Sequence, residues 1–318
     1  MSPEVFELLF DGPRLDRLRA LSGGPVGTLD DDDIADTEVL VTSWGAPRLD
    51  AALLDRMPKL RGVVHAAGSV QWLVSDEVWE RGIVVTSAAD ANAVPVAEYT
   101  FAAIILAFKR AFVHMRNPDE VLAWGDLVGS RRYGSMGRTV GIVGFSRIGR
   151  RVVRMLRGLD DVRVLVADPF VAVDDVAAAG AELVPLEDML GQVDVLSLHA
   201  PALPETHHLI GRAQLAALHD GATVINTARG WILDHEALTE ECAAGRLDAV
   251  LDVTDPDPLP SDSPLRRLPN VALTPHIAGS MGNEARRLAD SGLDDVEALL
   301  QDHLPARVIT RSDMELSA

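Results

Sequence analysis

An arginine, an aspartate and a histidine each follow an apolar run in the second half of the chain: Arg229, Asp257 and His276. The runs are 222–226, 249–253 and 271–273. The carboxyl ends of parallel strands meet at one edge of a doubly wound sheet, so these residues can converge there. An arginine can hold a substrate carboxylate through two parallel hydrogen bonds, and a histidine oriented by a carboxylate can donate or accept a proton. Hydride transfer to a 2-oxo acid requires such groups.

Each residue alone also has an ordinary structural explanation. Arg229 could form a surface ion pair, and His276 could be a hydrogen-bonded core histidine. Asp257 could be a turn residue between Pro256 and Pro258. The joint occurrence of the three after a nucleotide-binding turn favours the catalytic interpretation.

That turn lies in the segment from Val140 to Asp168, which has the pattern of strand, glycine turn, amphipathic helix and strand. Gly144 permits a tight turn, and Gly149 permits close packing of the helix on the strand. The helix N-terminus offers N–H groups to a pyrophosphate. Asp168 ends the second strand, where a carboxylate accepts hydrogen bonds from ribose hydroxyls and repels a 2′-phosphate. The segment therefore predicts a dinucleotide site that prefers NAD to NADP.

One position departs from the usual G-x-G-x-x-G pattern of such turns. Ser146 stands where the middle glycine is expected. Its side chain occupies space where the backbone approaches the phosphate. The nucleotide then either sits slightly further out or accepts a hydrogen bond from the hydroxyl.

Composition narrows the possible partners and compartments. The chain has 318 residues, which favours two domains, and 29 Lys+Arg against 48 Asp+Glu give a net charge of −19. This charge argues against nucleic acid or an anionic membrane as a partner. Cys242 is the single cysteine, the acidic N-terminus does not resemble a signal peptide, and no run approaches a membrane span. We expect a cytoplasmic protein, and the histidine spacing predicts no metal site.

Short apolar runs alternate with amphipathic segments along most of the chain, which predicts an α/β fold with two doubly wound parallel sheets. In the first half, strands are expected at 5–10, 38–42, 61–65 and 83–86, and helices at 14–21, 50–56 and 75–80. Pro95 can open a long apolar helix at 96–115, which should be buried between domains or subunits. A glycine-rich bridge at 117–138 follows. Later strands are expected at 193–199, 222–226, 249–253 and 271–273, and helices at 147–156, 212–218, 234–244 and 281–301.

Several motifs occur in an order that resembles the D-isomer-specific 2-hydroxyacid dehydrogenase family, which includes glyoxylate/hydroxypyruvate reductases and phosphoglycerate dehydrogenases. They are VGIVGFSRIG, VLSLHAPALPETHHLIG, VINTARGWILDHEAL, DVTDPDPLP and TPHIAG. The resemblance implies a Rossmann NAD-binding domain, residues 98–279, inserted into a flavodoxin-like substrate domain formed by residues 1–97 and 280–318. It also implies hydride transfer between NADH and a small 2-oxo acid, giving a D-2-hydroxy acid.

The resemblance also implies roles for individual residues. Arg229 would anchor the substrate carboxylate, His276 would be the acid/base, and Asp257 would be its carboxylate partner. Besides Gly144, Ser146 and Gly149 of the turn, the NAD site would include Arg147, Ile148, Asp168, His199, Thr206, Thr227, Ala228, Asp252 and Gly279. Backbone N–H groups of Ala67, Gly68 and Ser69 would bind the substrate carboxylate.

Two further positions depart from the family pattern. Asp257 replaces the usual catalytic glutamate, and its shorter side chain should need a backbone shift or a water to reach His276. The loop at 66–71 lacks the usual second glycine and the Asp-Asn that follows, which leaves substrate choice open.

Two alternatives to a 2-oxo acid reductase stay open at this point. One is an NAD-sensing protein of the same fold that acts as a corepressor, since Ser146 and Asp257 could mark relaxed catalytic constraint. The other is an oxidoreductase for an inorganic or one-carbon anion. We also expect a homodimer, with the helix at 96–115 and the bridge after it at the interface, where Trp124 could reach a partner's pocket.

Overall fold

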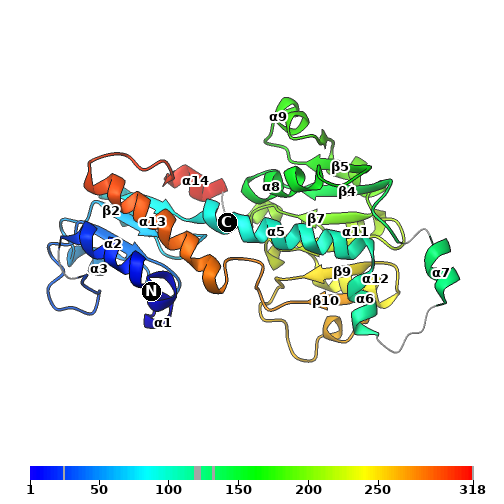
Figure 1. Cartoon of the computed structure of the whole chain (residues 1–318), viewed down its shortest axis with the longest axis horizontal. Coiled ribbons are helices and arrows are strands. Elements are labelled where there is room, and N and C mark those ends of the chain that lie inside the picture. The colour runs from blue at the N-terminus through cyan, green and yellow to red at the C-terminus, as the bar shows by residue number, and fades with distance from the viewer. Residues whose placement is uncertain (24–25, 118–122, 131–132, 317–318) are drawn as a thin grey trace. The chain divides into compact units, whose positions relative to one another are not determined.

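The structure, a computed structural model, describes residues 1–23, 26–117, 123–130 and 133–316. Two compact units form the chain (Figure 1). Unit 1 comprises Met1–Asn92 and Ser280–Ala318, and unit 2 comprises Ala93–Gly279. The boundary that the sequence analysis put at residue 97 falls inside helix α5 (Ala89–Phe108), and the units divide earlier on this helix.

Unit 2 contains a seven-stranded parallel sheet in the order β10-β9-β8-β7-β4-β5-β6. Its strands are β4 (Arg138–Val143), β5 (Val162–Ala167), β6 (Glu182–Leu183), β7 (Val195–Leu198), β8 (Thr223–Asn226), β9 (Asp248–Leu251) and β10 (Val271–Leu273). The chain order reverses between β4 and β7, which are adjacent at the centre of the sheet. This is the doubly wound order in which a dinucleotide binds at the carboxyl ends of the central strands. The predicted α/β fold with a Rossmann unit is confirmed.

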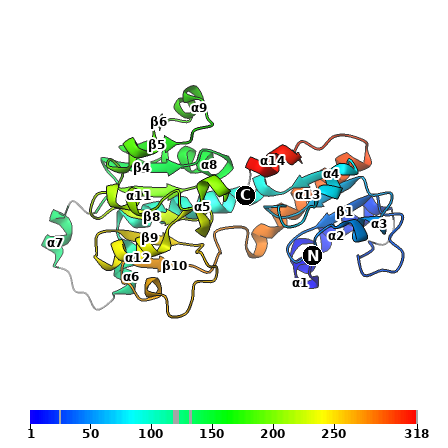
Figure 2. The ribbon, with the colours of Figure 1, turned by 180° about the vertical axis from the view of Figure 1, so that it is seen from behind.

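Helices cover both faces of this sheet because successive strand residues point to opposite sides (Figure 2). On β5, Val164 and Val166 pack in one core cluster with helices α5 and α8 (Arg147–Leu156), while Leu165 and Ala167 pack in the other. The second cluster includes residues of α10 (Leu186–Leu190), α11 (Arg212–Ala217) and α12 (His235–Ala243). Two hydrophobic layers therefore hold the strand ends that carry the candidate site.

Unit 1 has a four-stranded sheet in the order β1-β2-β3-β11. Its strands are β1 (Val39–Thr42), β2 (Gly62–His65), β3 (Val84–Ser87) and β11 (Val308–Ile309). The first three are parallel, but β11 runs antiparallel to β3, so this sheet is not entirely parallel as predicted. Helix α13 (Ala285–Leu300) packs on it through Val296 and Leu299, which contact Val64.

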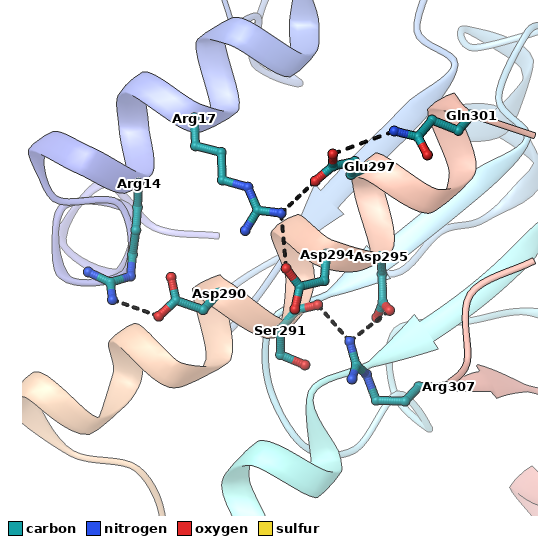
Figure 3. Close-up of polar contacts among 9 residues, drawn as sticks. All are labelled: Arg14, Arg17, Asp290, Ser291, Asp294, Asp295, Glu297, Gln301 and Arg307. Atoms are coloured by element: carbon teal, nitrogen blue, oxygen red, sulfur yellow. Dashed lines mark hydrogen bonds and ion pairs between the residues drawn. The ribbon is translucent and has the colours of Figure 1, made fainter. Parts of the chain in front are cut away.

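Ion pairs fasten α13 to two other segments of unit 1 (Figure 3). Arg14 of α2 (Gly12–Ser22) bonds Asp290 at 2.6 Å, and Arg17 of the same helix bonds Asp294 at 2.9 Å. Arg307, just before β11, donates to the buried carboxylate of Asp295 at 2.8 Å. The two ion pairs with α2 join the sequence-distant parts of unit 1, 1–92 and 280–318.

The expected strand at 5–10 is wrong, because this segment belongs to helix α1 (Pro3–Leu9). The side chain of Ser2 accepts a hydrogen bond from the N–H of Val5 at 3.4 Å, Pro3 occupies the first turn and Glu4 follows it. These are helix-start signals, and they outweigh the apolar run. The remaining segments of unit 1 are α3 (Ala51–Asp55), α4 (Asp76–Glu80), η4 (Gly282–Glu284) and α14 (Arg311–Leu316).

The long apolar helix also differs from its prediction. Helix α5 begins at Ala89 with Pro95 in its interior, and it ends at Phe108. Arg110 then adopts a left-handed backbone, with φ of 49°, before α6 (Ala111–Arg116). The other short segments of unit 2 are α7 (Trp124–Gly129), α9 (Val173–Ala178), η1 (Pro204–Thr206), η2 (Gly230–Ile232) and η3 (Pro264–Arg266).

By length and composition, α5 could cross a membrane, so the expectation that no run approaches a span is wrong. Half of its most apolar window is buried in the structure. A core helix of a folded protein meets the same test. Ala97, Ile104 and Phe108 of α5 are buried in the core of unit 2.

Candidate active site

The turn between β4 and α8 has the close backbone approaches that the glycine pattern predicts. Gly144 has φ of 95°, and a Cβ there would lie 2.7 Å from the backbone N of Ala200. A Cβ on Gly149 would lie 2.1 Å from the carbonyl oxygen of Gly144. Both positions thus require glycine, because a Cβ would overlap backbone atoms.

The N-terminus of α8 fits a dinucleotide phosphate. Ser146 is the N-cap residue and is exposed, and its side chain makes no capping hydrogen bond. The first-turn N–H groups are therefore not satisfied by the cap and can bind an anion. Arg147 is exposed and Ile148 half-buried in this first turn.

Asp168 follows β5, and its carboxylate is held in place by two backbone donors. Its Oδ2 accepts from the N–H of Phe145 at 2.7 Å, and its Oδ1 accepts from the N–H of Phe170 at 2.9 Å. Each oxygen keeps a second lone pair that a ribose hydroxyl can use. Sequence reasoning found Asp168 but missed these backbone donors, which give it a fixed orientation.

His199 and Thr206 lie on the loop after β7. His199 is buried, its Nε2 lies 2.9 Å from Ser197 Oγ, and burial lowers the pKa of the ring to about 3. Its Nδ1 has no partner among the described residues. The hydroxyl of Thr206 donates to the carbonyl of Pro201 at 2.6 Å and accepts from the N–H of Leu203 at 2.9 Å, so it stabilises its own loop.

The loop after β8 carries Arg229, and the buried Asn226 shapes it. Asn226 Oδ1 accepts from the N–H of Ala228 at 3.0 Å, and its Nδ2 donates to the carbonyl of Arg229 at 2.8 Å. Thr227, the next residue, places its Oγ1 2.8 Å from Thr100 Oγ1 on α5. Asn226 was not predicted as a site residue, although an amide that spans its own turn is a known turn signal.

Arg229 is a partly buried cation. Its Nη1 donates to the carbonyl of Ala228 at 2.7 Å, and it has no carboxylate partner among the residues that the structure describes. Burial lowers the pKa of the guanidinium, which nevertheless stays charged at neutral pH. The alternative of a surface ion pair therefore does not hold. The remaining donors can receive an anion.

His276 and Asp257 are in direct contact. Nδ1 of His276 lies 3.1 Å from Oδ2 of Asp257, so no water is needed between them. The side chains are 56% and 44% exposed, which rules out a core histidine. His276 has φ of 56°, a conformation that is rare outside glycine and is often found at functional sites.

Asp252 holds the loop that carries His276. Its carboxylate is buried and accepts from the N–H groups of Ile277 and Ala278, each at 2.8 Å, and from the hydroxyl of Thr274 at 2.6 Å. Its carbonyl accepts from the N–H of His276 at 3.0 Å. Asp252, which was predicted to line the cofactor site, thus fixes the backbone of this loop. Gly279, also predicted there, is the last residue of unit 2.

The predicted substrate loop lies in unit 1, after β2. The N–H of Ala67 donates to the carbonyl of His65 at 2.8 Å. The backbone N–H groups of Gly68 and Ser69 have no acceptor among the described parts of unit 1, and a Cβ on Gly68 would lie 3.5 Å from Asn92 Nδ2. The role of the loop in binding a carboxylate stays a prediction.

Comparison with known proteins decides the family. Residues 102–278 match the family described as D-isomer specific 2-hydroxyacid dehydrogenase, NAD binding domain. The chain belongs to this family. It is therefore an NAD-dependent oxidoreductase of the 2-hydroxyacid dehydrogenase type, and the cofactor expected from the turn and Asp168 is confirmed.

Relatives of this dehydrogenase have different names. A glyoxylate reductase of Korarchaeum cryptofilum is 33% identical over 282 residues, covering 87% of this chain and 84% of that protein. A D-3-phosphoglycerate dehydrogenase of Archaeoglobus fulgidus is also 33% identical, over 73% of this chain but only 44% of that protein. An (S)-sulfolactate dehydrogenase of Chromohalobacter salexigens is 35% identical over 80% of this chain and 82% of that protein.

Solved structures agree with the fold of the dehydrogenase. The TT0316 protein from Thermus thermophilus has a TM-score of 0.77 at 30% identity and covers 95% of this chain and 97% of its own. The holo form of Rhodotorula graminis D-mandelate dehydrogenase has a TM-score of 0.80 at 22% identity, covering 95% of both chains. The second comparison supports the fold alone.

Proposed function

We propose that this dehydrogenase reduces a small 2-oxo acid to its D-2-hydroxy acid with NADH. The contact of 3.1 Å between His276 and Asp257 carries this proposal, together with the charge of Arg229, which meets no carboxylate in the described part of the same unit. The three residues leave three strand ends of one parallel sheet, where ligands of doubly wound folds bind.

Each residue has one task in the proposed reaction. Arg229 binds the substrate carboxylate and polarises the carbonyl. NADH, when bound, supplies the hydride that reduces the carbonyl carbon. His276 delivers a proton to the carbonyl oxygen as its negative charge develops, and Asp257 orients the ring through Nδ1 so that Nε2 can donate that proton. One hydride and one proton thus convert the 2-oxo group into a hydroxyl group.

The cofactor residues have separate tasks in the same proposal. Gly144 and Gly149 allow the backbone to approach a pyrophosphate at the N-terminus of α8. Asp168 accepts hydrogen bonds from the ribose hydroxyls, which gives the preference for NADH over NADPH. The hydroxyl of Ser146 makes no capping hydrogen bond and can donate to the phosphate. A serine in place of the usual glycine is therefore compatible with binding.

The substrate class is tested by following NADH absorbance with a panel of 2-oxo acids. The panel contains glyoxylate, hydroxypyruvate, pyruvate, 2-oxoisocaproate and phenylpyruvate, and it is repeated with NADPH. We expect turnover of at least one acid with NADH, with the D product identified by chiral chromatography. His276→Ala should lower kcat by about 10²- to 10⁴-fold while NADH fluorescence reports unchanged binding.

Two outcomes would contradict the proposal. Near-full turnover by His276→Ala would remove the acid/base assignment. Tight NADH binding without turnover of any acid, together with capture of a protein partner, would favour the NAD-sensing corepressor. The direct contact between Asp257 and His276 argues against that alternative, because it retains the hydrogen bond that a relaxed site would not need.

A homodimer is the proposed assembly. It is supported by exposed apolar side chains on and near α7, where Trp124 is 79% and Val128 is 65% exposed. Large apolar side chains on a surface often mark an interface. Analytical ultracentrifugation should give the mass of two chains at micromolar concentration, and a monomer there would contradict the assignment.

A further inference from the structure

A tyrosine on α5 contacts the loop of the proposed acid/base, although the two are far apart in the sequence. The hydroxyl of Tyr99 lies 2.8 Å from Oγ1 of Thr274. Oγ1 of Thr274 in turn lies 2.6 Å from Oδ1 of the buried Asp252. The three side chains form a continuous chain of hydrogen bonds within unit 2.

The chemistry of the groups fixes the direction of these bonds. An ionised carboxylate only accepts, so Thr274 must donate its single proton to Asp252. The oxygen of Thr274 is then left as an acceptor, so Tyr99 must donate to it. Burial raises the pKa of the Tyr99 phenol and outweighs the smaller, opposite effect of the contact with Thr274, so the phenol stays protonated and remains a donor.

The chain of bonds ends on the carboxylate that holds both flanks of His276. Asp252 binds Thr274 on one side of the histidine and Ile277 and Ala278 on the other. His276 lies between them with φ of 56°. A residue in this unfavourable conformation keeps it only when its neighbours are fixed. The position of the imidazole thus depends on how firmly Asp252 is held.

We propose that Tyr99 is a positioning residue for His276 and acts through Thr274 and Asp252. The inference rests on the proposed function, in which His276 is the acid/base. The hydrogen bond from Tyr99 strengthens the one that Thr274 donates to Asp252, because hydrogen bonds in a chain polarise one another. Its loss displaces the imidazole from the carbonyl oxygen and leaves the carboxylate anchor Arg229 in place.

The test compares Tyr99→Phe with a matched variant, Tyr133→Phe. The chain has two tyrosines, and each makes a side-chain hydrogen bond in unit 2: Tyr133 OH lies 2.9 Å from Nε2 of His114. Tyr99→Phe should lower kcat by about two- to tenfold, the equivalent of one neutral hydrogen bond, with KM for the 2-oxo acid and Kd for NADH unchanged. Tyr133→Phe should lower Tm about as much as Tyr99→Phe does, but it should leave kcat unchanged.

Thr274 provides a test of the hydroxyl itself. Thr274→Val removes a hydrogen bond to a charged group and should lower kcat by about ten- to a hundredfold. Thr274→Ser keeps the hydroxyl and should stay within about twofold of the unaltered enzyme. If both Thr274 variants lose equal activity, packing rather than the hydrogen bond is responsible and the inference fails.

A double variant separates this inference from the function on which it rests. If Tyr99 acts through His276, adding Tyr99→Phe to His276→Ala should cause no further loss of kcat. An equal loss in both backgrounds would overturn the positioning role while leaving His276 in place as the acid/base. Full activity of His276→Ala would instead overturn the proposed function itself.

Discussion

Oδ2 of Asp257 lies 3.1 Å from Nδ1 of His276, although an aspartate is shorter than the glutamate that the family pattern leads us to expect. A bridging water is therefore not required. The side chains are 56% and 44% exposed, so water screens much of their mutual attraction. Asp257 therefore acts more by orienting the imidazole of His276 than by its charge.

We expect Asp257→Ala to lower kcat only about two- to fivefold, because an exposed pair of this kind contributes at most about 1 kcal/mol. Asp257→Glu should keep kcat within about twofold, since the longer side chain can still reach Nδ1. Steady-state kinetics with the best 2-oxo acid provide the measurement. A loss above a thousandfold in Asp257→Ala would mean that the carboxylate takes part in the reaction directly.

Replacement of Arg229 should weaken substrate binding, and a lysine at this position should not restore it. Both Arg229→Met and Arg229→Lys should raise KM for the 2-oxo acid about ten- to a hundredfold, because a single ammonium cannot bind both the Ala228 carbonyl and a carboxylate in a fork. Arg212→Met is the matched control, since Arg212 forms an exposed pair with Glu240. An unchanged KM in Arg229→Met would exclude it as the carboxylate anchor.

Replacement of Asp168 should change the choice between the two nicotinamide cofactors. Asp168→Ala removes the acceptors for the ribose hydroxyls and the charge that repels a 2′-phosphate, so Kd for NADH should rise about tenfold or more relative to Kd for NADPH. Asp168 also bonds the N–H groups of Phe145 and Phe170, so the variant loosens the turn for both cofactors. The ratio of the two Kd values, measured by fluorescence, corrects for that effect. A constant ratio would contradict the assignment.

Addition of a methyl group at Gly149 should destabilise unit 2. The new Cβ would lie 2.1 Å from the carbonyl oxygen of Gly144, so helix α8 must move away from the turn. We expect Gly149→Ala to lower Tm by about 5 °C or more and to weaken NADH binding. Gly191→Ala is the control, because Gly191 has φ of −73° and a Cβ there meets no atom within 4 Å. Equal Tm values for the two variants would show that α8 does not pack this closely.

The sequence predicted those parts of the site for which the spacing of apolar residues and the order of the strands lead to the same conclusion. The residue ranges of α8 and β10 match their predictions, because the spacing of apolar residues and the residues that flank each segment indicate the same ends. Arg229, Asp257 and His276 could be found because each follows a strand of one parallel sheet. The contact between Tyr99 and Thr274 could not be found, since it joins residues 175 positions apart that no spacing rule relates.

Errors arose where two local signals compete. The run at 5–10 is apolar enough for a strand, but Ser2 and Pro3 start a helix before it. Pro95 is suited to a first helical turn, yet α5 begins at Ala89. In both cases the residues before the apolar run, rather than the run or the proline itself, determine where the helix begins.

Acid should destabilise unit 1 through His65. Burial lowers the pKa of this histidine to about 4 from 6.5. In the unfolded chain the ring takes up a proton below about pH 6.5, whereas the folded ring stays neutral down to about pH 4. The free energy of unfolding should therefore be highest above about pH 6.5 and should fall by about 3 kcal/mol as pH drops to about 4.

The pH effect is measured by urea unfolding at a series of pH values. His65→Gln, which cannot take up the proton, should show a smaller decrease over the same range. Thr42 Oγ1, 3.0 Å from Nδ1 of His65, can bond the amide instead. Identical pH dependence in the two proteins would mean that His65 is not responsible.

The pairing of Val308 with Thr86 has a consequence for biosynthesis. All of unit 2 lies between these two residues in the chain. Because domains fold as units during N-to-C synthesis, unit 2 can form on the ribosome while strand β3 still has an open edge. Unit 1 completes its sheet only after β11 has emerged. Until then the nascent protein exposes a strand edge that other chains can pair with, so slow translation of the segment between β3 and β11 should favour aggregation.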